Sequence, residues 1–104
     1  MSEHATDIAK FTSNVNADAV KEIVHYCGIA LRSRDASLVS TSDAKELETI
    51  RDGFATKKLG LTSDAADAAI KKVAEKMKGE HNKSRVTFYY LLAEASGTMN
   101  KLVK

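Results

Sequence analysis

The chain contains no proline, and this absence constrains its fold more than any other feature of the sequence. Average usage would place about five prolines in a chain of this length. Fifteen of the 104 residues are alanine, the strongest helix former. Because no residue lacks a backbone N–H or has a locked φ, nothing in the sequence forces a helix to break. We therefore expect an all-α fold.

The length of 104 residues predicts a single helical domain over residues 1–104, with residues 1–5 and 98–104 loosely ordered. Folding at this mass removes about two-thirds of the unfolded surface from water, so a core can form without disulfides or metal. No charge-free stretch approaches the roughly twenty residues that span a bilayer. The polar, acidic N-terminus and the lone thiol of Cys27 predict a cytoplasmic protein without a secretory signal.

One helix is predicted over residues 17–31. Asn16 precedes it as a candidate N-cap, and Asp18 places a negative charge in the first turn. The apolar residues recur at spacings of three and four, which gives one buried stripe: Val20, Ile23, Val24, Cys27 and Leu31. A shorter helix over residues 6–14 is expected to dock through Ile8 and Phe11.

The tetrapeptide Thr-Ser-Asp-Ala at residues 41–44 recurs at residues 62–65. Each copy is predicted to begin a helix, over residues 43–58 and 64–78, with Ser or Asp as the cap and Glu46 completing a capping box with Asp43. Gly60 and Gly79 lie where left-handed C-caps are expected. A true duplication and the independent use of one good cap both remain open. The short connection makes the two helices antiparallel or sharply angled neighbours.

The segment from Val86 to Leu92 is rich in β-branched and aromatic residues and could form a strand. Its apolar residues do not alternate, however, and Gly97 lies where a helix would be capped. We predict a helix that begins at about Ser84 and ends at about Ser96. Because it is apolar on nearly every side, we expect it to be central in a compact bundle or array of about five helices.

Several stretches resemble a family of small bacterial proteins known as domain of unknown function 2853. They are LRSRDASLVS at residues 31–40, RDGF at 51–54, KKLGL at 57–61 and SRVTFYYLLAE at 84–94. The similarity covers roughly residues 15–95. The resemblance implies a bacterial source and a compact helical domain. It implies no activity, and it transfers no site residue.

The residues that commonly carry catalysis are scattered. His25 and Cys27 lie about 200° apart around one helix, so their side chains cannot meet, and Cys27 is interpreted as buried filler. The single cysteine and the three histidines lack the spacing of metal ligands, and the five glycines are isolated, unlike those of phosphate-binding loops. Glu48 and Asp52, one turn apart, are interpreted as solvated surface. We expect no metal and no cofactor, and the residues favour a non-catalytic function over an enzyme.

The best candidate for an anion site leads into the last helix. The free N–H groups of a helix start, a hydroxyl and flanking cations could hold a phosphate or a carboxylate: the residues are His81, Lys83, Ser84 and Arg85. The alternative is that Ser84 or Asn82 only caps the helix while Lys83 and Arg85 are solvated. The long connection over residues 32–41 carries charge, but it assigns no site by itself.

The charge of the chain is uneven. Residues 1–52 carry six basic and nine acidic groups, whereas residues 53–104 carry ten and five. A basic stripe on the helix at 64–78 could contact nucleic acid: Lys71, Lys72, Lys76 and Lys78. The alternative is a ladder of ion pairs through Asp67, Lys71 and Glu75. A helix-turn-helix around residues 59–62 would present carboxylates and no bidentate reader to DNA, which argues against it.

The function that we predict is a non-catalytic protein-interaction or self-associating helical domain. The surplus of apolar residues on the last helix suggests a homodimer interface formed by Phe88, Tyr89 and Leu92. One alternative is a nucleic-acid-associated protein that uses the basic stripe at residues 71–85. Another is an enzyme whose site cannot be recognised from the sequence. No membrane partner is expected.

Overall fold

The computed structural model describes residues 3–12, 15–28, 38–39, 41, 43–79 and 83–102. A π-helix, η2, directly continues the third of five α-helices, and a 3₁₀-helix, η3, follows the fifth. The elements are α1 (Glu3–Ile8), α2 (Ala17–Cys27), α3 (Ala44–Ile50), η2 (Arg51–Lys58), α4 (Ser63–Lys76), α5 (Arg85–Ser96) and η3 (Met99–Lys101). These described residues contain no strand. The β-type contact found among them is an isolated antiparallel bridge between Leu38 and Ser84. The prediction of an all-α fold is confirmed.

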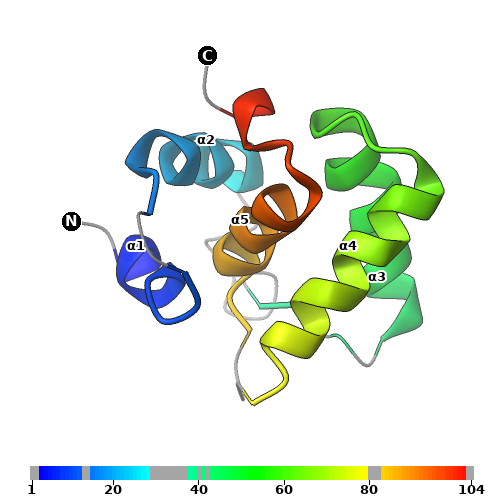
Figure 1. Cartoon of the computed structure of the whole chain (residues 1–104), viewed down its shortest axis with the longest axis horizontal. Helices are drawn as coiled ribbons and strands as arrows, with labels where there is room; N and C mark the ends of the chain where they lie inside the picture. Colours follow the sequence, from blue (N-terminus) through cyan, green and yellow to red (C-terminus); the bar gives the residue numbers. More distant parts are fainter. Residues whose placement is uncertain are drawn as a thin grey trace.

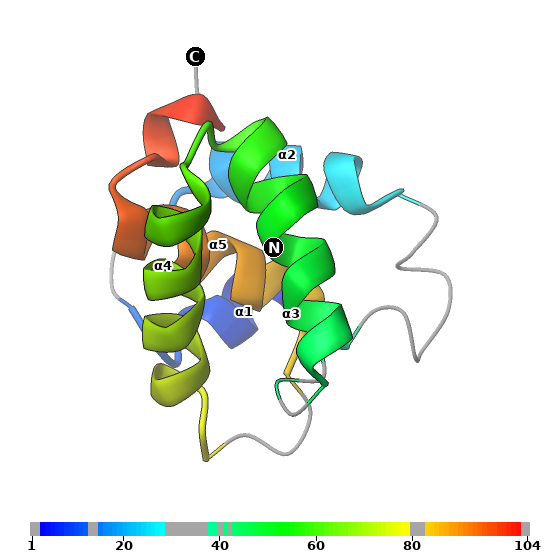
Figure 2. The same cartoon turned by 90° about the vertical axis from the view of Figure 1, so that its right-hand side faces the viewer.

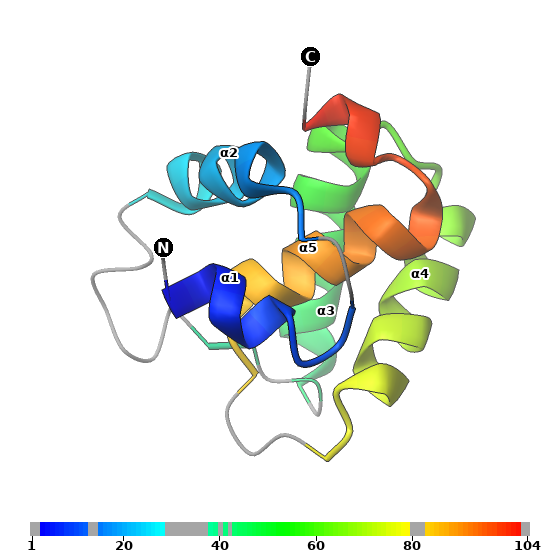
Figure 3. The same cartoon turned by 60° about the vertical axis from the view of Figure 1, so that its left-hand side comes forward.

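Helix α5 lies at the centre of the molecule (Figure 1). All residues from 86 to 93 are buried, and α5 contacts α1, α2, α4, η2 and η3. Figure 3 shows it passing between α1 and α2 on one side and α4 on the other. Gly97 ends the helix in a left-handed conformation with φ of 70°. The prediction that residues 86–92 form a central helix is confirmed.

Polar groups on this buried helix hold the N-terminal part of the chain. The backbone N–H of Asn16 donates to the hydroxyl of Tyr90 at 2.8 Å. The hydroxyl of Thr87, which is fully buried, donates to the carboxylate of Asp7. A buried hydroxyl without a partner would be costly, so these bonds determine where α1 and the start of α2 dock on α5.

The first two helices differ from prediction in their bounds. Helix α1 is shorter and begins earlier than the predicted 6–14, but Ile8 is fully buried and Phe11 packs against the core as expected. Helix α2 begins after its predicted cap: the Asn16 side chain accepts from the N–H groups of Asp18 and Ala19. It ends at Cys27 because Gly28 takes a φ of 47°, so the predicted end at residue 31 is wrong. Leu31 itself lies outside the described residues.

The two copies of Thr-Ser-Asp-Ala cap their helices in different registers. In the first copy the side chain of Asp43 accepts from the N–H of Lys45 at 3.0 Å. In the second copy the hydroxyl of Thr62 accepts from the N–H of Ala65 at 3.2 Å. The prediction that Ser or Asp caps this helix is therefore wrong. Gly60 is left-handed with φ of 72°, as predicted, whereas Gly79 does not have a positive φ. Met77 occupies the C-cap position of α4 instead.

The predicted helix over 43–58 is not α-helical throughout, since it changes to π geometry at Arg51. The buried residues from Ile50 onward are Ile50, Phe54, Ala55 and Leu59, at positions i, i+4, i+5 and i+9. A π-helix has i→i+5 bonds and therefore more residues per turn than an α-helix, which matches this wider spacing. Continued α geometry would turn a lysine toward the core. Figure 2 shows α4 running back alongside the continuous helix formed by α3 and η2. The helices that follow the two Thr-Ser-Asp-Ala copies are therefore antiparallel neighbours, as predicted.

Candidate functional site

An open groove runs along the outer face of α3 and η2. Its volume is about 360 Å³, within the lower part of the range typical of ligand sites. The residues that line it recur at three to five positions, as one face of the continuous helix requires: Lys45, Glu48, Thr49, Asp52, Gly53 and Lys57. Gly53 contributes no side chain, and a Cβ added there would meet nothing within 4 Å. The absence of a side chain at this position helps to keep the middle of the groove open.

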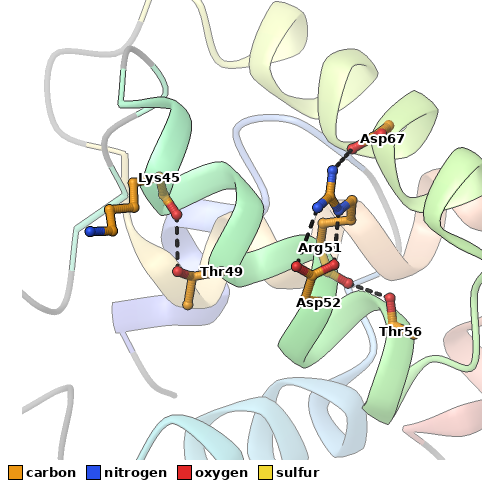
Figure 4. A network of polar contacts seen from close by, with 6 residues as sticks. All are labelled: Lys45, Thr49, Arg51, Asp52, Thr56 and Asp67. Atoms are coloured by element: carbon orange, nitrogen blue, oxygen red, sulfur yellow. Dashed lines mark hydrogen bonds and ion pairs between the residues drawn. The ribbon is translucent and has the colours of Figure 1, made fainter.

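One wall of the groove is fixed by Arg51, as Figure 4 shows. Its guanidinium donates to both carboxylate oxygens of Asp52, at 2.9 and 3.2 Å, and lies 3.6 Å from Asp67 on α4. The hydrogen bond from Arg51 lowers the pKa of Asp52. The hydroxyl of Thr56 donates to the backbone carbonyl of Arg51. Asp52 is therefore an ionised group whose charge is already shared with a cation.

Three other charges of the groove form no ion pair as close as that of Asp52. Within the part of the chain that the structure describes, Lys45, Glu48 and Lys57 make no side-chain hydrogen bond or ion pair, although Glu48 interacts electrostatically with Arg51 and Lys57 with Asp52. Lys45 contributes its backbone carbonyl to the hydroxyl of Thr49 at 2.9 Å, and its ammonium group extends away from the helix (Figure 4). The groove thus presents a cation at each end and a carboxylate between them.

Arg85, which we predicted to bind anions, is turned into the protein. It donates to the hydroxyl of Tyr89 at 3.0 Å and to the carbonyl of Leu38 at 3.2 Å. It also forms an ion pair with Glu46 at 2.5 Å, so Glu46 takes part in a tertiary contact. Only 13% of the Arg85 side chain is exposed, against 21% for Glu46. Arg85 therefore connects α3, α5 and the segment at 38–39.

The structure describes two of the other three residues of the predicted anion site. The backbone carbonyl of Lys83 accepts from the N–H of Val39 at 2.7 Å, and Ser84 pairs with Leu38 in the isolated bridge. Ser84 occupies the N-cap position of α5 without a side-chain cap bond. His81 lies outside the described residues. The structure brings Lys83, Ser84 and Arg85 together around the segment at 38–39.

An aromatic cluster joins α2, η2 and α5. Phe54 stacks on Tyr89 with ring centroids 4.1 Å apart, and Tyr26 meets Phe54 edge-on at 5.2 Å and Tyr89 at 6.4 Å. The guanidinium of Arg85 lies 5.7 Å from the centre of the Tyr89 ring. Among the described residues, Tyr26 is the large hydrophobic side chain that lies exposed at the surface, with 42% of its surface accessible. The cluster therefore ends in an aromatic ring at the surface.

Cys27 follows Tyr26 and is only partly buried. Burial raises the pKa of its thiol to about 11, although the nearby charge of Arg85 acts in the opposite direction. The thiol is therefore protonated near pH 7, which makes it a poor nucleophile. His25 is exposed on the other face of α2. Cys27 is therefore less buried than the sequence predicts, and it packs against the core as a partly buried residue.

The basic stripe on α4 and on the turn that follows it is exposed but partly paired. Lys76 lies 3.8 Å from Glu94 on α5, and Lys78 lies 3.8 Å from Glu75. Asp67 pairs with Arg51, so the described ion pairs differ from the predicted ladder. Lys71 and Lys72 complete the exposed stripe.

The match to known proteins concerns almost the whole described region. Over residues 3–100 the chain matches the family described as protein of unknown function (DUF2853). The chain belongs to the DUF2853 family. No curated protein matches it closely enough to indicate a relationship. The resemblance found in the sequence is confirmed, and the function of this DUF2853 chain has to be argued from its residues.

Two features of this DUF2853 chain escaped the sequence analysis. The π-helix was missed because residues 43–58 were compared with α periodicity alone, although Ile50, Phe54, Ala55 and Leu59 already show the wider spacing. The inward turn of Arg85 had one local signal, its four-residue separation from Tyr89. Its bond to Glu46, across 39 residues, had none. Among the described residues, no helix could span a membrane, and no group of three or more His, Cys, Asp or Glu could hold a metal ion.

Proposed function

We propose that this chain is a non-catalytic domain that binds another protein through the surface around Tyr26. The observation that carries the proposal is an exposed tyrosine held in place by Phe54 and Tyr89. Tyrosine is enriched among residues that dominate binding energy, since its large ring buries apolar area while its hydroxyl keeps a polar partner. A ring already braced by two neighbours loses little freedom when a partner covers it.

The surroundings of Tyr26 suit such an interface. Lys58 on η2 donates to Glu22 on α2 at 2.9 Å, so a charged pair joins the same two helices that hold Tyr26 and Phe54. Both side chains are partly exposed. Protein interfaces typically combine an aromatic centre with a polar rim. The lone cysteine and the family resemblance also support a bacterial, cytoplasmic setting.

The alternatives have less support. Self-association was predicted from surplus apolar residues on the last helix, but Phe88, Tyr89 and Leu92 are all buried within one chain. That helix leaves no apolar face for a second copy, so the argument for a homodimer loses its basis. Nucleic-acid binding would use the α4 stripe, two of whose four lysines already face carboxylates. An enzymatic function has no observation in its favour.

A photocrosslinking experiment tests the proposal. A photoreactive phenylalanine derivative is introduced at Tyr26 and, as the matched control, at exposed Lys72 on α4, in cells that naturally make the protein. We expect a specific adduct with one protein at position 26 and none at position 72. The purified partner should then bind Tyr26→Ala about 30-fold more weakly than wild type, and Tyr26→Phe nearly as well. Equal crosslinking at both positions would overturn the proposal.

A further inference from the structure

The groove along α3 and η2 places two cations and a carboxylate on one face of a continuous helix. Some charged side chains of the described surface close on one another, as in the pairs Lys58–Glu22 and Lys78–Glu75. Within the described ranges Lys45, Glu48 and Lys57 form no such ion pair, although Glu48 interacts electrostatically with Arg51 and Lys57 with Asp52. Their charges are therefore available to a ligand without the breaking of an existing ion pair.

The geometry of the helix determines the spacing of these charges. Lys45 and Lys57 are twelve residues apart, which is no more than about 18 Å along the helix axis at 1.5 Å per residue. Glu48 lies between them, and the carboxylate of Asp52 lies farther along, already held by Arg51. This length exceeds that of a small metabolite and corresponds to about three turns of an α-helix. A protein segment can reach both cations at once.

We propose that the groove binds a helical segment of a partner protein that carries acidic residues at its two ends and basic residues between them. The inference rests on the proposed protein-binding function and specifies the chemistry of the partner. Acidic residues eleven positions apart on a helix lie on one face, about 16 Å apart, and can approach Lys45 and Lys57 together. Basic residues at intermediate turns of that face then meet Glu48 and Asp52. The groove provides room beside Gly53.

Two synthetic helices of identical composition test this pattern. The first has glutamates at positions 1 and 12 and lysines at positions 5 and 8, on an alanine and glutamine background. The second exchanges every glutamate for lysine and every lysine for glutamate. Both have the same net charge, and both patterns read the same in either chain direction. At low salt we expect the first peptide to bind about tenfold more tightly, since each exposed ion pair changes affinity by up to about fivefold.

Two matched protein variants locate the binding. The double variant Lys45→Glu and Lys57→Glu should lose about tenfold affinity for the first peptide. The control, Lys71→Glu and Lys72→Glu on α4, has the same net charge and should stay within twofold of wild type. Circular dichroism should show both variants folded, because all four lysines are exposed. Equal affinity for the two peptides, no measurable binding, or an equal loss in both variants would overturn the inference.

The two proposals fail separately. A specific adduct at Tyr26 together with indifference to the peptide pattern removes the groove inference and leaves the proposed function standing. If no protein is captured at Tyr26 but the first peptide binds selectively, the groove is supported, and the anchor assigned to Tyr26 is wrong.

Discussion

At the scale of single residues, Cys27 shows how burial determines chemical behaviour. Its thiol is partly enclosed, and desolvation of the thiolate raises its pKa to about 11, above the ordinary value of 9.0. Below pH 9 the thiol is protonated in both the folded and the unfolded chain. Between pH 9 and 11 the unfolded chain loses this proton while the folded chain keeps it. Stability contributed by the neutral thiol is therefore lost as the pH rises through this window.

We expect the free energy of unfolding of the wild type to fall between pH 9 and 11 more steeply than that of Cys27→Ala. The difference should be about 1 to 2 kcal/mol, since the partial exposure of the thiol reduces the full effect. Urea denaturation at a series of pH values measures it. Tyr89, whose pKa is raised by burial and also by the charge of Cys27, is present in both proteins, so the comparison removes the part of its titration that does not depend on Cys27. Parallel pH profiles would show that the thiol is not desolvated.

At the scale of elements, η2 is best understood as a helix with one residue too many for α geometry. From Ile50 onward the buried positions follow a spacing that only a wider helix places on one face. The π form keeps Phe54 stacked on Tyr89 and Leu59 in the core. On the opposite face it leaves Gly53 in the groove. The same backbone change thus serves the core and shapes the candidate site.

Deletion of Gly53 should convert this segment into an α-helix without unfolding the protein. The shortened chain would place the four buried residues at i, i+3, i+4 and i+8, the pattern of an amphipathic α-helix. We expect a melting temperature within about 5 °C of wild type, because the core register is preserved. Backbone amide NMR would measure the change from i→i+5 to i→i+4 bonding.

Deletion of Ala68 is the matched control for the loss of one residue. Ala68 is exposed in the middle of α4, which is regular α-helix, so its removal rotates Ile70 and Val73 by about 100° relative to the preceding turns. We expect a loss of more than about 10 °C in melting temperature or failure to fold. If both deletions were equally damaging, the interpretation of η2 as an insertion would be wrong.

At the scale of the whole molecule, Arg85 connects parts of the chain that are far apart in sequence. Its guanidinium holds Glu46 on α3, the carbonyl of Leu38 and the hydroxyl of Tyr89 on α5. Because the side chains of Arg85 and Glu46 are only 13% and 21% exposed, water screens their attraction weakly. The pair fixes the start of α3 against the start of the central helix.

Replacement of either partner alone should therefore be costly. We expect Arg85→Met or Glu46→Leu to lower the free energy of unfolding by about 2 to 4 kcal/mol, since each removes one charge of an ion pair that is mostly enclosed by protein. The double variant should cost less than the sum of the two, with a coupling energy of about 1 to 3 kcal/mol. Chemical denaturation of all four proteins measures this cycle.

The exposed pair Lys78–Glu75 provides the control cycle. Both side chains are 77% exposed and lie 3.8 Å apart, with Glu75 in the last turn of α4 and Lys78 in the turn that follows it. Its coupling energy should be below about 0.5 kcal/mol, because water screens exposed charges. A coupling as small as this for Arg85 and Glu46 would show that their ion pair is not a tertiary connection.

The sequence by itself determined the all-α class, the buried helix at residues 86–92 and the caps at Asn16, Asp43 and Gly97, because these depend on neighbours within a few residues. The tertiary structure decided where Arg85 points, that Tyr26 reaches the surface, and which charges of the groove form ion pairs with the described residues. Local patterns specify which face of a helix is apolar. They do not specify which distant helix will cover it, and a side chain's partners follow only from that packing.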